Sequence, residues 1–177
     1  MENIEILPVK AKDVLHLQDI SKLTFSQTFS AINSEENMAK YLEESFSIDQ
    51  LNEELHNESS LFYFAKLNDE VIGYMKLNTG EAQKENQNDN ALEIERIYVL
   101  QEFQGKKVGQ LLYLHAIKVA EGLSADYVWL GVWEKNFRAI AFYKKNGFVA
   151  FDQHVFILGD DRQIDILMKL ELAPRNE

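Results

Sequence analysis

The chain has no cysteine and only two prolines among its 177 residues. The absence of cysteine excludes a disulfide scaffold, a thiolate metal site and a cysteine nucleophile that would carry an acyl group. Long apolar runs are also missing: no segment approaches the ~20 apolar residues that a helix needs to cross a bilayer. The N-terminal stretch MENIEILPVK lacks the apolar core of a signal peptide. We therefore expect a soluble, cytoplasmic protein that does not act on a membrane.

Basic residues are in the minority, with 18 lysines and arginines against 29 aspartates and glutamates and a net charge of −11. Residues 1–60 contain 12 acidic and 4 basic side chains, whereas residues 101–177 contain 10 of each. Nucleic acid is disfavoured as a partner, because binding to its phosphates needs a basic surface. A polyphosphate on the neutral part and a cation on the acidic part fit this asymmetry, although a merely solvated acidic surface would look the same.

The length of 177 residues suits a single domain over 1–177. Apolar residues make up 46% of the chain and aromatic residues 11%, which excludes extensive disorder and supplies a sizeable core. The spacing predicts strands at 4–8, 61–66, 71–77, 92–100, 148–158 and 164–172 and before Asn136, and helices over 11–29 and after Ser34, Ser47, Gly109 and Asn136. The order β-α-α-α-β-β-β-α-β-α-β-β predicts one mixed sheet with helices on its faces.

Turn-forming residues separate these elements. Asn68-Asp69 suits a hairpin turn between the second and third strands, and residues 159–161 suit another between the last two. The polar stretch 79–90 is typical of a mobile loop within a domain. We expect a frayed tail after Pro174.

The stretch from Glu93 to Gln110 has the layout of an anion-binding site. A strand leads through a polar turn over 101–104 into a run that contains two glycines and two lysines, and an amphipathic segment follows. This arrangement aims free backbone N–H groups and the positive end of a helix at an anion, usually a phosphate. The P-loop pattern fails because no Ser or Thr follows a Gly-Lys pair, and the dinucleotide fingerprint fails on spacing.

Two motifs within this layout resemble those of one enzyme family. Gln104 to Gly109 is similar to Q/R-x-x-G-x-G/A, the acetyl-CoA pyrophosphate loop of the GNAT N-acetyltransferases, with Lys107 in place of the middle glycine. We expect Lys107 to keep an ordinary helical backbone there, because the first turn of a helix does not require positive φ. Residues 128–148 resemble a strand followed by N-x-x-A-x-x-x-Y-x-x-x-G-F, with matches at Asn136, Ala139, Tyr143, Gly147 and Phe148. Two motifs in the right order are far more specific than one. The resemblance implies an α/β GNAT fold, with a mixed, mostly antiparallel sheet of about seven strands and helices on both faces, and an acetyl-CoA cofactor.

Acyl transfer to an amine needs a base, because an alkyl ammonium with a pKa of about 10 is almost wholly charged near pH 7. Glu93 and Glu95 are the candidates, and a period of two places both on one strand face with Ile97 and Val99. By resemblance, the Val99 N–H donates to the acyl oxygen and Tyr143 supplies a proton to the leaving thiolate. A surface glutamate and a core tyrosine are the alternatives.

The resemblance also implies a set of cofactor contacts. These come from the strand, the loop and the second motif: Ile97, Tyr98, Val99, Gln104, Gly105, Lys106, Lys107, Val108, Gly109, Gln110, Asn136, Arg138, Ala139, Tyr143 and Lys145. Asn136 also suits the N-cap of its helix. Arg138 and Lys145 could equally be ordinary charged residues on the surface of a helix, because the sequence pattern would be the same. The four histidines share no ligand spacing, so we expect no metal.

The likeness extends beyond the superfamily core. TFSQTFSAINSEENMAKYLEESFSIDQLNEEL and the two motif stretches resemble the bacterial spermidine/spermine N-acetyltransferases of the PaiA type. This implies a small polyamine acceptor, which Phe29, Tyr41, Glu35 and Glu36, together with the nearby Glu43 and Glu44, would bind; a homodimer is possible. Another amine (an amino acid, an aminoglycoside or a peptide N-terminus) and a non-catalytic acyl-CoA-binding module are the alternatives. Gly131 stands where enzymes that acetylate protein N-termini tend to carry a glutamate, which weakens the peptide alternative.

Overall fold

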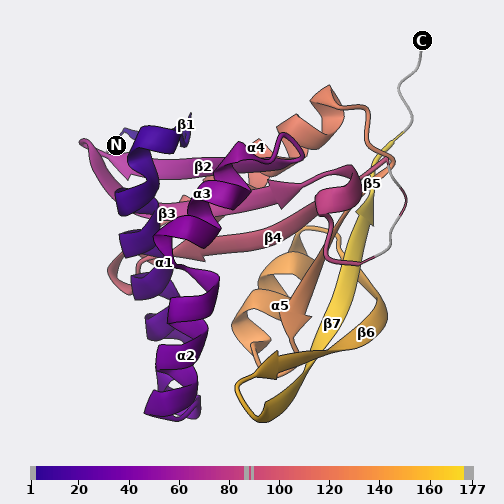
Figure 1. Cartoon of the computed structure of the whole chain (residues 1–177). Coiled ribbons are helices and arrows are strands. Elements are labelled where there is room, and N and C mark those ends of the chain that lie inside the picture. The colour runs from indigo at the N-terminus through magenta and orange to yellow at the C-terminus, as the bar shows by residue number, and fades with distance from the viewer. Residues whose placement is uncertain (1–2, 86–87, 89, 174–177) are drawn as a thin grey trace.

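The computed structural model describes residues 3–85, 88 and 90–173 (Figure 1). Within them, one seven-stranded sheet has the order β1-β2-β3-β4-β5-β7-β6. The strands are β1 (Ile4–Pro8), β2 (Ser60–Leu67), β3 (Glu70–Asn78), β4 (Ala91–Val99), β5 (Tyr127–Trp133), β6 (Val149–Leu158) and β7 (Asp161–Glu171). The helices are α1 (Val14–Phe29), α2 (Glu35–Ser45), α3 (Ile48–His56), α4 (Val108–Gly122) and α5 (Phe137–Lys145). The predicted order of elements is confirmed, whereas the expected tail after Pro174 lies outside the described residues.

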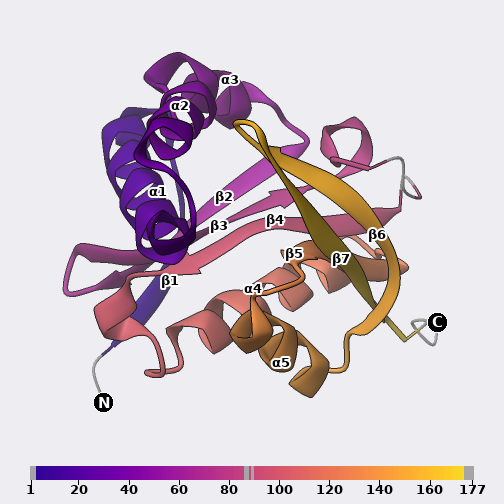
Figure 2. The same cartoon turned by 90° about the horizontal axis from the view of Figure 1, so that it is seen from below.

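Helices cover both faces of the sheet, as predicted (Figure 2). One face packs against α1, α2 and α3 and forms an apolar cluster around Leu17, Phe46 and Leu51. The other face packs against α4 and α5, with Leu112 and Tyr143 in its cluster. Among the strands of the described residues, only β4 and β5 pair in parallel. Among the described residues, no helix combines the length and apolar character needed to span a membrane.

Short polar residues set the element boundaries for local reasons. The Ser34 and Ser47 hydroxyls accept the backbone N–H three residues on, at 3.1 and 3.2 Å, and so cap α2 and α3. Asn68 and Asp69 both adopt positive φ, as a two-residue hairpin turn requires. The first turn expected at 11–13 is a 3₁₀ turn, and α1 begins at Val14.

A β-bulge in β4 changes which side chains share a face. Leu77 pairs with Ile94 and Lys76 with Arg96, so Glu95 is an extra residue without a cross-strand partner. Ile94, Ile97 and Val99 all belong to the α4 side of the sheet. The prediction that Glu93 and Glu95 share a face with Ile97 and Val99 is therefore wrong. The extra residue at the bulge shifts the alternation by one position, so Ile97 and Val99 point to the face opposite that of Glu93.

The two parallel strands separate soon after they meet. The β4–β5 ladder extends only from Ala91 to Glu93 on β4, although that strand continues to Val99. The Leu100 N–H bonds to Ile72 of β3, whereas the Val99 carbonyl accepts a bond from the side chain of Gln104. Residues 94–99 thus present a strand edge that β5 leaves open.

Candidate active site

A cavity of about 610 Å³ opens where β4 and β5 separate. Its lining includes Phe29 of α1 and Tyr41 of α2 on one side, and Trp133 of β5 and Tyr143 of α5 on the other. Glu93 and Glu95 line it from β4. The fold therefore brings both candidate bases, the candidate proton donor and three of the predicted acceptor-binding residues, Phe29, Tyr41 and Glu44, into one space.

Glu93 lies almost wholly inside the protein, with 3% of its surface exposed. Its Oε2 accepts hydrogen bonds from Asn78 Nδ2 and from the Lys84 backbone N–H, each at 2.9 Å. Burial raises the pKa of Glu93 to about 7, and the two hydrogen bonds offset only part of that effect. This carboxylate can accept a proton near neutral pH and release it again.

Glu95 differs from Glu93 because cations surround it. Lys76 Nζ lies 2.6 Å from its carboxylate, Lys84 Nζ 3.2 Å and an Arg96 nitrogen 3.4 Å. Burial alone would raise the pKa of Glu95, but Arg96, Lys76 and Lys84 outweigh it and lower the pKa to about 2. At neutral pH this carboxylate is a fixed charge and a poor base.

Asn78 links the two carboxylates. Its Nδ2 donates to Glu93 and also to Glu95, at 2.9 and 2.7 Å, and its own Oδ1 accepts from the Ser60 hydroxyl at 3.0 Å. Glu54 of α3 also belongs to this network, because its carboxylate lies 3.1 Å from Lys76 and 3.0 Å from Arg96. The network holds both glutamates in place while their pKa values stay far apart.

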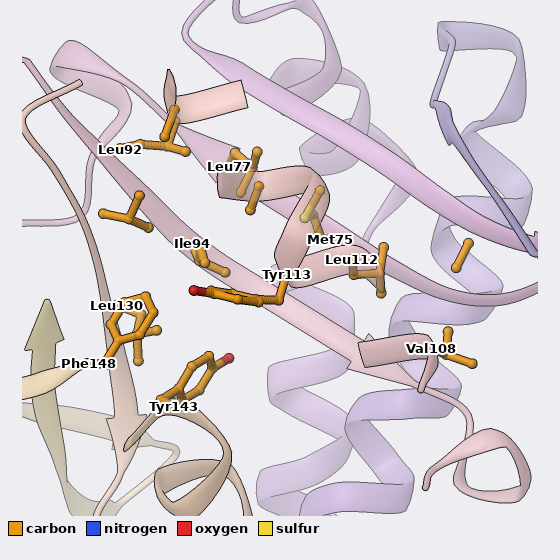
Figure 3. Close-up of a cluster of buried hydrophobic side chains, with 14 of the residues drawn as sticks. Met75, Leu77, Leu92, Ile94, Val108, Leu112, Tyr113, Leu130, Tyr143 and Phe148 are labelled. Carbon is orange, nitrogen blue, oxygen red and sulfur yellow. The ribbon is translucent and has the colours of Figure 1, made fainter. Parts of the chain in front are cut away.

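Tyr143 lies in α5 with 6% of its surface exposed. Its ring packs against Phe148 with a centroid separation of 5.5 Å, in the cluster that also contains Tyr113 and Leu130 (Figure 3). Burial raises the pKa of the Tyr143 hydroxyl, so the group keeps its proton at neutral pH. Because it lines the cavity, its hydroxyl is suited to donate a proton there.

The loop before α4 presents free backbone donors. No described residue accepts a backbone hydrogen bond from Gly105, Lys107, Val108, Gly109 or Gln110. These five groups lie at the N-terminus of a 15-residue helix, where the helix dipole favours an anion. The residues present fit the pyrophosphate of coenzyme A.

Lys107 departs from its predicted conformation. We expected an ordinary helical backbone, but its φ is +67°, in the left-handed region. An L-residue in this region costs roughly 1–2 kcal/mol relative to glycine, which explains why the related motif has glycine there. The prediction was wrong because Lys107 is the N-cap residue and lies outside the first helical turn.

Replacement of Gly109 tests the loop. A Cβ at Gly109 would meet no atom of the chain within 4 Å, so valine should be tolerated by the fold but should obstruct a phosphate. We expect Gly109→Val to weaken coenzyme A binding by about tenfold or more in calorimetry. Gly122→Val is the matched control, because Gly122 ends the same helix and its Cβ would also meet nothing within 4 Å. Equal affinities of the two variants would contradict this role of the loop.

The other predicted cofactor contacts border the same gap. Asn136 caps α5, as predicted, because its Oδ1 accepts the Ala139 N–H at 3.2 Å. Arg138 donates to the Gln104 side chain, which in turn donates to the Val99 carbonyl at 3.1 Å. This chain of contacts spans from α5 to β4. Lys145 and Lys106 are exposed.

The acidic residues of α2 differ in whether they line the cavity. Glu44 lines the cavity, but Glu35 and Glu36 are exposed and do not. Glu43 lies 4.0 Å from Lys22 at the surface. Sequence patterns did not predict the network residues that surround the two glutamates or the cavity residues of β5, β6 and β7: Glu54, Lys76, Asn78, Lys84, Trp133, His154, Gln163 and Asp165. The available signal was Asp165 in the strand predicted over 164–172, with a second polar residue, Gln163, two positions before it.

Comparison with known proteins agrees with this geometry. The acetyltransferase (GNAT) family model matches residues 23–148. An uncharacterized N-acetyltransferase in the pepI 3′ region of Lactobacillus delbrueckii subsp. lactis is 44% identical over 173 residues, which cover 98% of this chain and 100% of the relative. A spermidine N(1)-acetyltransferase from Thermoplasma acidophilum is 29% identical over 154 residues, 85% of this chain and 91% of the relative.

A solved structure extends the likeness to the whole fold. The crystal structure of the PaiA N-acetyltransferase from Thermoplasma acidophilum in complex with coenzyme A superimposes with a TM-score of 0.79 at 26% identity, covering 96% of this chain and 99% of that one. The predicted α/β fold and the predicted cofactor are confirmed. The chain belongs to the GNAT family and is an acetyl-CoA-dependent N-acetyltransferase.

Proposed function

We propose that the chain acetylates a primary amine of a small polycation, spermidine or spermine, by direct attack of the amine while both substrates are bound. The observation that carries this proposal is the acidic wall of the cavity. Six carboxylates line it, Glu44, Glu54, Glu85, Glu93, Glu95 and Asp165, against the permanent cations Lys84 and Arg96. Such a surplus of negative charge favours a cationic acceptor. The similarity to a spermidine N(1)-acetyltransferase supports the same acceptor.

In this proposal Glu93 is the general base. Its pKa of about 7 lets it take a proton from the acceptor ammonium, directly or through a water, whereas Glu95 remains ionised. Asn78 orients the Glu93 carboxylate through its 2.9 Å hydrogen bond. We predicted that Glu35 and Glu36 bind the polyamine. In this proposal the carboxylates that line the cavity bind it instead, because Glu35 and Glu36 do not line the cavity.

The opposite side of the site would act on the acyl donor. Bound acetyl-CoA supplies the activated acetyl group. The Val99 carbonyl faces the open edge of β4, since it accepts from Gln104, and the N–H of a strand residue points to the same side as its carbonyl. We propose that this N–H donates to the acyl oxygen as negative charge develops on it. The Tyr143 hydroxyl supplies a proton to the leaving sulfur.

Steady-state release of coenzyme A thiol across a panel of amines tests the assignment. We expect kcat/KM to be at least about tenfold higher for spermidine and spermine than for amino acids, aminoglycosides or a peptide N-terminus, because only the polyamines place several ammonium groups against the acidic wall. A higher kcat/KM for one of the other amines would overturn the polyamine assignment. No thiol release with any amine would favour a non-catalytic module. A cytoplasmic location and a homodimer stay predictions.

A further inference from the structure

The cavity has a second polar group of residues, away from Glu93, that takes no part in the proton transfers proposed above, although its carboxylate, Asp165, belongs to the acidic wall. Asp165 of β7 pairs in register with Trp133 of β5, and Gln163 pairs with Phe156 of β6. All four residues line the cavity. We call Asp165, Gln163, Trp133 and Phe156 the distal wall.

Gln163 has an unused acceptor in this wall. Its Nε2 donates to the Asp161 carboxylate at 2.7 Å and to Asn33 Oδ1 at 3.2 Å. Because a carboxylate only accepts, the amide can have only this orientation, and its oxygen faces elsewhere. Gln163 is 7% exposed, and its Oε1 has no hydrogen-bond partner among the described residues. A buried acceptor without a donor is costly, so the group is suited to a ligand that brings an N–H.

Asp165 adds negative charge that the protein only partly compensates. The ring nitrogen Nε2 of His154 lies 3.8 Å from its carboxylate, and the other ring nitrogen lies 3.1 Å from Glu85. Burial raises the pKa of Asp165, and His154 offsets only part of this effect. Gly131 leaves room in front of the carboxylate: a Cβ there would lie 3.6 Å from Asp165 Oδ2.

Aromatic residues line the same cavity, and two of them, Trp133 and Phe156, are the cross-strand neighbours of Asp165 and Gln163. The Trp133 ring lies 6.1 Å from that of Phe29, and the Phe156 ring lies 5.9 Å from that of Tyr41. Aromatic faces beside carboxylate and amide oxygens are suited to an organic ammonium group. A metal ion is a poorer match, since no group of described histidine or acidic side chains has the arrangement of a metal site.

We propose that the distal wall binds the second ammonium group of the acceptor, so that the enzyme selects acceptors by the spacing between their two ammonium groups. The proposal rests on the proposed function, because it places the reacting amine at Glu93. Glu93 pairs with Trp129 and Asp165 with Trp133, and four residues of strand span about 13 Å. An acceptor must therefore be several methylenes long to contact both ends, which a simple monoamine cannot do.

Asp165→Asn tests the proposal, because it removes the charge and keeps the shape. KM for spermidine should rise about tenfold, the effect of one charge-assisted hydrogen bond, while KM for butylamine stays unchanged. Glu121→Gln is the matched control: it removes the same charge from an exposed residue outside the cavity and should leave both constants unchanged. Circular dichroism verifies the fold of each variant. Spermidine affinity, measured by calorimetry in the presence of coenzyme A, gives a readout that does not need turnover.

The two assays separate this inference from the proposed function. If Asp165→Asn turns over spermidine with the same KM as the wild type, the distal wall does not bind the second ammonium group. The proposed acetylation of polyamines would not be contradicted by that result. Spermidine binding that weakens in Asp165→Asn, without turnover in the wild type, would support the wall and overturn the activity. An absence of both binding and turnover would overturn both.

Discussion

Replacing Glu93 by glutamine is expected to lower kcat by about 100- to 10,000-fold, the usual contribution of a general base. Glutamine keeps the size of the side chain and an oxygen that can accept from Asn78 and the Lys84 N–H, but it cannot take a proton. In the wild type, kcat/KM should rise with pH through an apparent pKa of about 7, since the protonated carboxyl below that pH is inactive. This inflection should be lost in Glu93→Gln.

Glu95→Gln is the matched comparison on the same strand. Glu95 is already ionised throughout the neutral range because its pKa is about 2, so its loss should leave the inflection near pH 7 in place. The variant should instead lose stability, by about 1.5–3 kcal/mol, because Lys76 and Arg96 would then share the single buried carboxylate of Glu54. A Glu93→Gln enzyme that retains both its rate and the inflection would show that the base lies elsewhere.

Stability gives an independent check on Glu93. Its folded pKa of about 7 lies above the ordinary value of a glutamate, so ionisation of Glu93 favours the unfolded chain, and this cost grows as pH rises between the two values. Glu93→Gln removes the cost. We therefore expect the variant to be at least as stable as the wild type above pH 7 in urea denaturation, although its activity is lost.

Tyr143→Phe should lower kcat by about 100- to 10,000-fold if the hydroxyl gives its proton to the leaving sulfur. The phenylalanine ring retains the packing against Phe148, so the fold and the affinity for coenzyme A should change little. Rapid-quench measurement of a single turnover separates the chemical step from product release.

Tyr113→Phe provides the control for this substitution. Tyr113 belongs to the same apolar cluster (Figure 3) and is 6% exposed, as is Tyr143, but it does not line the cavity. Its hydroxyl lies 3.5 Å from the Asn146 carbonyl. We expect Tyr113→Phe to keep the wild-type kcat. Similar rates for the two variants would mean that the sulfur leaves without a proton from Tyr143.

Local patterns in the sequence determined the order of the elements. Period-two and helical spacings depend only on near neighbours along the chain, and turn residues such as Asn68-Asp69 restrict the backbone where they stand. The family was also visible in the sequence, because the pyrophosphate loop and the motif from Asn136 to Phe148 each consist of residues close together in the chain.

The tertiary structure decided everything that depends on contacts between distant residues. Sequence spacing treats Glu93 and Glu95 as equivalent, but Asn78, Lys76 and the bulge at Glu95 come from pairing with β3, and they set the two pKa values apart. The positive φ of Lys107 follows from how the chain enters α4. The cavity brings β4 together with β7, about 70 residues later in the chain, so no periodicity could place Asp165 in the same space as Glu93.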